Sequence, residues 1–298
     1  MRNILFAISL LACAVLAQPV QAQSKADYYA AGTFEYAGIT LPFRQLSLNA
    51  SADGPAALVL ILHGGTARGT DNAKQLEAAA LDSVEQYLRA NEMKAILLAP
   101  QCPADRMWNE AASSASPTMT DCLRAWLDEF AAANAVDSSR IYLFGFSMGG
   151  SGAWRLLNDN PTLFAGAGVA AATARMVRAQ NVKATPVYAI AGANDTIMDA
   201  QQIEDFVQSL ANLGGETRFD LLPDADHFQT CDYAFTTERL DWVFAHQRTA
   251  LAGISDVRCE RGKAVNIYNL QGLPVSAQTR GVQIRQDEHG NSWKVLVK

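Results

Sequence analysis

Two patterns of hydrophobic and polar positions alternate along most of the chain. Short runs that are almost wholly apolar, such as 57–62 and 94–100, are typical of strands buried on both faces. Longer segments with apolar residues every three or four positions, such as 118–135, are typical of amphipathic helices. Because the two kinds of segment follow one another in turn, the pattern predicts an α/β fold, with a mostly parallel central sheet covered by helices on both faces.

The predicted elements begin with a strand pair at 34–48, where polar and apolar positions alternate. The later predicted strands lie at 57–62, 94–100, 141–144, 163–172, 185–193 and 217–222, and the predicted helices at 72–92, 118–135, 151–158, 200–213 and 233–248. After Leu251 the helix pattern stops, and short alternating stretches with glycine turns follow. The sequence therefore predicts a main domain at 23–252 and a small β appendage at 253–298.

The first 22 residues predict a secretory signal peptide. Arg2 supplies a positive charge, residues 4–16 form an apolar stretch, and small residues at 20–22 offer a cleavage site. The protein is therefore expected to be secreted, periplasmic or held at the cell surface. The apolar stretch is too short to span a bilayer as a helix, so no membrane span is expected. Lipidation at Cys13 is the alternative interpretation of this segment.

The charge balance limits the classes of partner. The chain carries 24 Lys and Arg against 30 Asp and Glu, a net charge of −6, which becomes −7 once the segment with Arg2 is removed. No basic stretch interrupts this balance, so binding to nucleic acid or to an anionic membrane surface is not expected.

Four cysteines remain after the predicted signal peptide. An even number in an exported protein favours disulfides, and four cysteines allow three connectivities. We expect Cys102–Cys122, which would fasten the two ends of one loop, and Cys231–Cys259, which would tie the main domain to the appendage. The spacings fit no metal-site pattern, and neither a metal nor a cofactor is expected.

The stretch "RIYLFGFSMGGSGAW" places Ser147 between Gly145 and Gly149. A buried-strand pattern precedes the serine and a helix pattern follows it, so the serine lies at a strand-to-helix corner. The G-x-S-x-G nucleophile elbow requires this context, because its glycines leave room for the strained turn that lifts the hydroxyl out of the sheet. Ser147 is therefore the predicted nucleophile.

A serine hydroxyl needs an adjacent base, and the chain has four histidines. His227 lies in a predicted polar loop after the last main strand, where the chain order of α/β-hydrolases, Ser then acid then His, places the base. The other three are His63, which comes before the serine, His246, which ends a helix, and His289, which belongs to the appendage. We predict His227 as the base; the alternative is an ordinary surface-loop histidine.

The acid that orients this base is expected between Ser147 and His227, at the carboxyl end of a strand. Asp195 directly follows an apolar strand and precedes a helix, so it is the predicted acid, with Asp226 or Asp224 as alternatives. Its role would be to fix the imidazole tautomer and to stabilise the imidazolium, not to accept a proton.

Backbone N–H groups are expected to bind the negative charge that develops on the substrate carbonyl. The elbow offers the amide of Met148, and the loop "HGGTARG" after the first parallel strand offers Gly65 or Thr66. One such donor contributes roughly 3 kcal/mol of transition-state stabilisation.

Five stretches, taken as a set, carry a resemblance to a known family: "LHGGTARGTDNAKQL", "LLAPQCP…MW", "VDSSRIYLFGFSMGG", "AGANDTIM" and "DADHFQTCDYAF". They resemble the secreted single-domain esterases of the prolyl-oligopeptidase-like branch of α/β-hydrolases, which includes polyhydroxybutyrate-depolymerase-like proteins and feruloyl or acetyl-xylan esterases. The resemblance covers about residues 30–250, and it implies that Ser147, Asp195 and His227 form a triad and that the loop with Trp108 lies near the pocket. It departs at Ala191, where many members carry a histidine.

The C-terminal tail contains the stretches "IYNLQGLPV", "GVQIRQ" and "KVLVK". They resemble the sorting domains of proteins exported by the type IX system, which implies a partner in the outer-membrane secretion machinery. The tail departs at 281–283, where these domains usually have glycine, an aliphatic residue and tyrosine. A purely structural β-hairpin is the alternative.

The expected function is hydrolysis of acetyl or feruloyl esters of polysaccharide through an acyl-enzyme. Met107 and Trp108, in the loop after the strand at 94–100, are the expected contacts for an acyl or aryl group. The alternatives are a general carboxylesterase or lysophospholipase, a peptidase, and a non-catalytic binding protein on a hydrolase scaffold. Peptidase activity is less favoured, because the chain lacks the length for the propeller domain of prolyl peptidases.

Overall fold

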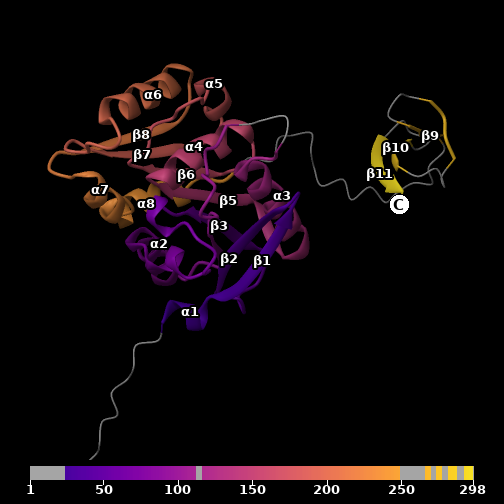
Figure 1. Ribbon diagram of the computed structural model, residues 1–298, viewed down its shortest axis with the longest axis horizontal. Helices are drawn as coiled ribbons and strands as arrows, with labels where there is room; N and C mark the ends of the chain where they lie inside the picture. The colour runs from indigo at the N-terminus through magenta and orange to yellow at the C-terminus, as the bar shows by residue number, and fades with distance from the viewer. Residues whose placement is uncertain are drawn as a thin grey trace, which may run out of the picture. The chain divides into compact units, whose positions relative to one another are not determined.

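The computed structural model describes residues 24–111, 116–248, 266–269, 273–276, 281–286 and 292–297. By its internal contacts the chain divides into two compact units, 1–248 and 249–298, which are described separately (Figure 1). The predicted signal peptide at 1–22 and Cys13 lie outside the described residues.

The first unit is built on an eight-stranded sheet with the order β1-β2-β4-β3-β5-β6-β7-β8. Strands β3 to β8 are parallel to one another, whereas β2 is antiparallel to both β1 and β4. The predicted mostly parallel α/β fold is therefore confirmed. The strands are β1 (Ala30–Tyr36), β2 (Ile39–Leu48), β3 (Ala56–Leu62), β4 (Ala95–Pro100), β5 (Val136–Phe146), β6 (Gly166–Ala170), β7 (Val187–Gly192) and β8 (Thr217–Leu222).

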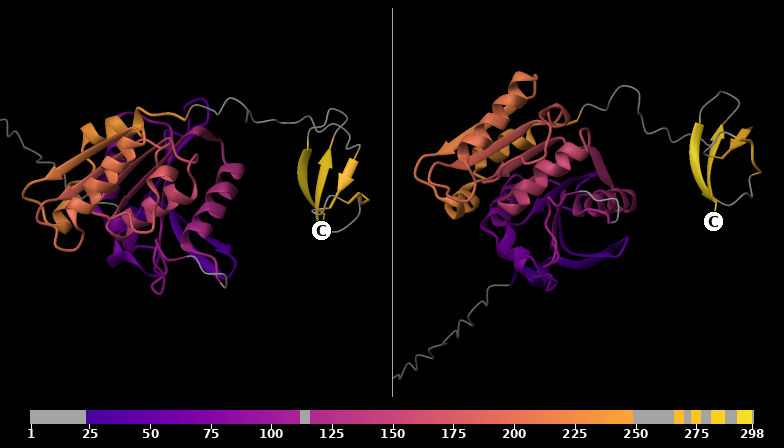
Figure 2. Two further views of the ribbon diagram at one scale, coloured as in Figure 1. Left: turned by 90° about the horizontal axis from the view of Figure 1, so that it is seen from above. Right: turned by 45° about the horizontal axis from the view of Figure 1, so that its top comes forward.

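Helices cover both faces of this sheet (Figure 2). Successive side chains of a strand point to opposite faces, so β3 sends Leu58 and Leu60 into one core and Val59 and Ile61 into the other. The first core is closed by α3 (Met119–Ala133), α4 (Met148–Asp159), α5 (Ala179–Val182) and α6 (Ala200–Asn212), and the second by α2 (Ala79–Ala90) and α8 (Thr237–Phe244). This double coverage explains why the central strands are apolar throughout.

Of the remaining short helices, α1 (Lys25–Tyr28) precedes β1, and η1 (Gly65–Ala67), η2 (Lys74–Glu77) and α7 (His227–Tyr233) occupy connections. Two of them change the predicted picture. The predicted helix at 72–92 is divided into η2 and α2, and the stretch after β8 that we expected as a polar loop becomes helical at His227.

The second unit contains an antiparallel three-stranded sheet, in the order β11-β10-β9. Its strands are β9 (Asn266–Tyr268), β10 (Gly281–Gln286) and β11 (Ser292–Val297). The predicted small β appendage is present.

The cysteines depart from the prediction. Cys102 and Cys122 are free thiols in the first core, so the predicted bridge between them is wrong. Both pack there as small apolar side chains. Polar contacts brace the loop that the bridge would have closed: Glu110 pairs with Arg106 and accepts a hydrogen bond from the N–H of Met119 (2.8 Å).

The second predicted bridge involves Cys259, which lies outside the described residues; Cys231 is a buried free thiol. Within the described parts of the chain, no helix is both long and apolar enough to cross a membrane. The same parts contain no cluster of three or more His, Cys, Asp or Glu side chains that could hold a metal ion.

Candidate active site

Ser147 stands in a strained turn between β5 and α4. Its backbone has φ 54° and ψ −126°, a conformation that costs free energy for any residue with a side chain. The Ser147 N–H donates to the carbonyl of Ala170 (3.0 Å), at the end of the neighbouring strand β6. A Cβ at Gly145 would lie 2.4 Å from the Gly149 carbonyl oxygen, and one at Gly149 would lie 2.0 Å from that of Leu62. Both glycines are therefore required by close backbone contacts.

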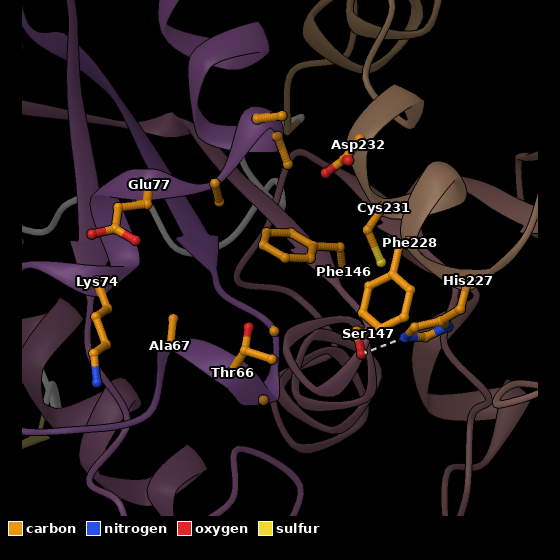
Figure 3. A pocket seen from close by; sticks show the side chains of 15 residues that line it. Thr66, Ala67, Lys74, Glu77, Phe146, Ser147, His227, Phe228, Cys231 and Asp232 are labelled. Atoms are coloured by element: carbon orange, nitrogen blue, oxygen red, sulfur yellow. Dashed lines mark hydrogen bonds between the residues drawn. The ribbon is translucent and has the colours of Figure 1, made fainter.

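His227 is the first residue of α7, and its ring reaches Ser147. The histidine Nε2 lies 2.8 Å from the serine Oγ (Figure 3). Asp226 caps this helix: its carboxylate accepts the N–H of Gln229 (2.9 Å), whose side chain in turn accepts the N–H of Asp226 (3.0 Å). This capping box fixes the start of α7. It also assigns Asp226, an alternative acid in the sequence, to a structural role.

Asp195 lies after β7, and its carboxylate contacts the other ring nitrogen of His227. Its Oδ2 is 2.8 Å from Nδ1, while its Oδ1 accepts the N–H groups of Ile197 and Met198 (2.8 Å each). Because an ionised carboxylate only accepts, the ring proton belongs on Nδ1, and Nε2 is free to accept the proton of Ser147. The Asp195 side chain is 1 % exposed and that of His227 is 6 % exposed. The structure thus brings the three predicted residues into one hydrogen-bonded chain.

The loops of the acid and the base are packed against each other. The N–H of Asn194 donates to the carbonyl of Ala225 (3.0 Å). A Cβ at Gly192 would lie 2.2 Å from Thr230 Oγ1, so the end of β7 touches α7 directly. These contacts hold the carboxylate of Asp195 next to the imidazole of His227.

The three predicted oxyanion donors lie beside the serine. Met148 begins α4, and Gly65 and Thr66 begin η1, so their N–H groups have no partner within those helices. An added Cβ on Gly65 would lie 3.9 Å from Cβ of Met148, and one on Gly64 would lie 3.6 Å from Cβ of Ser147. The two helix starts therefore meet at Ser147.

Ser147 and His227 open into a cavity of about 600 Å³ (Figure 3). Two aromatic side chains that the sequence analysis missed, Phe146 and Phe228, line it close to the serine; Phe228 is 63 % exposed. Their positions in the sequence, immediately before Ser147 and immediately after His227, could have indicated that they line the cavity. The cavity is lined by Gly64, Gly65, Thr66, Ala67, Lys74, Glu77, Ala78, Ala79, Ala80, Phe146, Ser147, His227, Phe228, Cys231 and Asp232.

The cavity also contains a thiol, that of Cys231. Burial raises the pKa of this thiol to about 12, with a smaller contribution from the nearby Asp195. The group therefore stays protonated at neutral pH and does not compete with Ser147 as a nucleophile.

The two predicted substrate contacts do not line this cavity. Trp108 is fully buried: its Nε1–H donates to the carbonyl of His63 (3.1 Å), and its Cβ lies where a Cβ on Gly152 would have to be placed (2.2 Å). Met107 is 47 % exposed, outside the set of cavity residues. The indole of Trp108 packs against α4 at Gly152 and points away from the cavity that we expected it to line, whereas contact of Met107 with a substrate stays a prediction.

Comparison with known proteins identifies a matching family and several solved structures of similar fold. Residues 90–243 match the dienelactone hydrolase family, whereas no curated protein matches the chain. A solved thermostable esterase is 24 % identical with a TM-score of 0.66 over 74 % of this chain, which spans only 64 % of that esterase.

Matches to two more solved structures each cover 98 % of the solved chain. A ferulic acid esterase is 15 % identical (TM-score 0.58, 73 % of this chain), and an S-formylglutathione hydrolase from Staphylococcus aureus is 15 % identical (TM-score 0.55, 72 % of this chain). At these identities the three similarities establish the α/β-hydrolase fold. Since the family match spans more than half of the sequence, the chain belongs to the dienelactone hydrolase family.

Proposed function

We propose that the protein hydrolyses carboxylic esters through an acyl-enzyme on Ser147, and that its substrates are acetyl or feruloyl esters of polysaccharide. The observation that carries the proposal is the continuous hydrogen-bonded chain from Ser147 through His227 to Asp195, at the edge of an open cavity. A serine, a histidine with its tautomer fixed and a buried carboxylate in this order are the parts that acyl transfer needs.

The reaction follows from the atoms in place. Nε2 of His227 accepts the proton as Oγ of Ser147 attacks the ester carbonyl carbon, and the resulting oxyanion is bound by the N–H groups of Met148 and of Gly65 or Thr66. The imidazolium then gives its proton to the departing alcohol, leaving the acyl group on Oγ. In the second half, a water molecule gives one proton to Nε2 as its oxygen attacks the acyl carbon. When the bond from that carbon to Oγ breaks, Nε2 returns the proton to Oγ, which releases the acid and restores the serine.

The lining of the cavity supports an aromatic acyl group. Phe146 and Phe228 offer ring faces close to Ser147, and aromatic pairs contribute about 0.5–1.5 kcal/mol beyond the area that they bury. The end of the cavity far from His227 carries the charged side chains of Lys74 and Glu77 (Figure 3), which suit the hydroxyl groups of a sugar. A ferulic acid esterase among the fold neighbours is in keeping with this proposal.

We further propose that the protein acts outside the cytoplasm. The support is the sequence alone: the predicted signal peptide at 1–22 and the tail that resembles type IX sorting domains. Mass spectrometry of the protein purified from culture medium tests it. A mature N-terminus near Gln23 is expected, and an intact Met1 on a protein retained in the cytoplasm would contradict it.

A substrate panel tests the activity. We expect turnover of p-nitrophenyl acetate, methyl ferulate and acetylated xylan, with higher kcat/KM for methyl ferulate than for methyl esters of long-chain acids. Ser147→Ala, the matched control, should lose several orders of magnitude of rate with an unchanged circular dichroism spectrum. Preferred cleavage of a lysophospholipid or a peptide anilide would move the function to those alternatives. No turnover of any substrate would favour the non-catalytic binding protein.

A further inference from the structure

His63 is a buried histidine that takes no part in the proposed proton transfers. It follows β3 directly and is 2 % exposed. Its Nε2 lies 2.9 Å from the backbone nitrogen of Cys102, and its Nδ1 lies 2.7 Å from the carbonyl oxygen of Gly64. Because a backbone N–H can only donate, Nε2 must be the acceptor, and the single ring proton sits on Nδ1 and is donated to Gly64.

The Gly64 carbonyl and the Gly65 N–H belong to the same peptide unit. In a trans peptide these two groups point in opposite directions, and none of the described peptide bonds is cis. The carbonyl is held by Nδ1 of His63 and also accepts the N–H of Ala67 (3.2 Å). Fixing this carbonyl toward the buried histidine fixes the Gly65 N–H on the opposite side, and both glycines line the cavity at Ser147.

Trp108 fixes the histidine in turn. Its Nε1–H donates to the His63 carbonyl (3.1 Å), and its ring meets the imidazole edge to face, with centroids 5.3 Å apart. The same indole packs against α4 at Gly152, a turn and a half after the nucleophile. One side chain therefore links the loop after β3 to the helix that carries Ser147.

The protonation state of His63 suits this role. Burial lowers the pKa of His63 to about 4, so the ring is neutral at physiological pH and keeps one donor and one acceptor nitrogen. A doubly protonated ring would set an N–H against the N–H of Cys102.

We propose that His63 and Trp108 are positioning residues that hold the Gly65 N–H in the orientation needed to bind the oxyanion. The inference rests on the proposed ester hydrolysis. It assigns a function to the Trp108 side chain that does not require contact with substrate.

Two amide variants separate the two hydrogen bonds of His63. In His63→Asn the side-chain amide can occupy the position of Nδ1 and donate to Gly64, whereas in His63→Gln it can occupy the position of Nε2 and accept from Cys102. We expect kcat within tenfold of the parent for His63→Asn and a decrease of about 100-fold for His63→Gln, since one oxyanion donor is worth about 100- to 1,000-fold in kcat. KM should change less than threefold in both.

Trp108→Phe provides a second measurement, because it keeps a ring in the core but removes the Nε1–H. Here too we expect a lower kcat with an unchanged KM, and weaker binding of an aryl trifluoromethyl ketone, whose adduct with Ser147 places an oxyanion at the Gly65 N–H. Equal kcat losses in His63→Asn and His63→Gln, or losses that track only the melting temperature, would overturn the inference.

Fluorophosphonate labelling separates this inference from the proposed function. The rate of labelling of Ser147 depends on the same donors but not on the identity of the ester. If the parent hydrolyses no ester of the panel, the proposed function fails, and the labelling rates still decide the inference. Faster labelling of His63→Asn than of His63→Gln would support it, and equal rates would overturn it.

Discussion

Replacing Asp195 with asparagine is expected to disable the site without unfolding the protein. The carboxylate accepts two backbone N–H groups on Oδ1 and the imidazole N–H on Oδ2, each at 2.8 Å. An asparagine has one acceptor oxygen. If that oxygen keeps the two backbone bonds, its NH₂ group faces His227 and requires Nδ1 to accept, which moves the ring proton to Nε2.

In that tautomer Nε2 cannot take the proton of Ser147. Loss of the correct tautomer costs about 10⁴-fold in kcat in serine proteases, equivalent to about 5.5 kcal/mol of transition-state stabilisation. We expect a decrease of that order for Asp195→Asn, with KM changed only a few-fold, measured by steady-state hydrolysis of p-nitrophenyl acetate with the fraction of folded protein checked by circular dichroism.

The matched control is Asp226→Asn, one residue before the base. Asp226 caps α7 with a single accepted hydrogen bond from Gln229, and asparagine caps helices about as well as aspartate does. Its activity should stay within a few-fold of the parent. A kcat for Asp195→Asn within tenfold of the parent, or a collapse in Asp226→Asn, would refute the assignment of the acid.

Three further outcomes are expected. Gly149→Ala should lower the melting temperature and the activity together, because its Cβ would lie 2.0 Å from the Leu62 carbonyl oxygen and overpacking costs about 1–3 kcal/mol; an unchanged melting temperature would show that α4 can shift. Phe228→Ala should raise the KM for methyl ferulate about five- to tenfold and leave the KM for methyl acetate unchanged. Tyr233→Ala, which removes a similarly exposed aromatic side chain outside the cavity, should change neither KM. The pKa of His63 in the folded protein is about 4, below the ordinary value of 6.5. The stability that neutral His63 contributes is therefore complete above pH 6.5, and up to about 3 kcal/mol of it is lost as the pH falls toward 4. Chemical denaturation at several pH values should show that the free energy of unfolding falls more steeply with decreasing pH in the parent than in His63→Asn.

The sheet and the order of the reacting residues could be predicted because both leave local signals. Strands buried on two faces are apolar throughout, and the turn at Ser147 is indicated by the glycines close to it in the sequence. The helical start at His227 was also readable, since Asp226 and Gln229 have capping-box spacing, but the polar composition of the stretch suggested a loop.

The packing around the site could not be predicted from the sequence in the same way. Whether Trp108 faces the cavity or the core depends on Gly152, 44 positions away, which leaves the indole room against α4. The sequence carries no local sign of that contact. The disulfide predicted between Cys102 and Cys122 is wrong for a related reason. The spacing of the two cysteines in a loop-to-helix segment does not indicate the apolar neighbours that bury them.

The sheet order divides the reacting groups between two halves of the chain. The proposed nucleophile and oxyanion donors follow β5 and β3, whereas the proposed acid and base follow β7 and β8. The connection between β6 and β7 passes through Met176, which is 65 % exposed, so a chain cut there would yield two fragments that each expose a wholly apolar strand at the new edge. Neither fragment could turn over substrate alone, and pairing of β6 with β7 would be the event that restores activity. The fold therefore lends itself to a split reporter, in which hydrolysis signals the meeting of two fused partners.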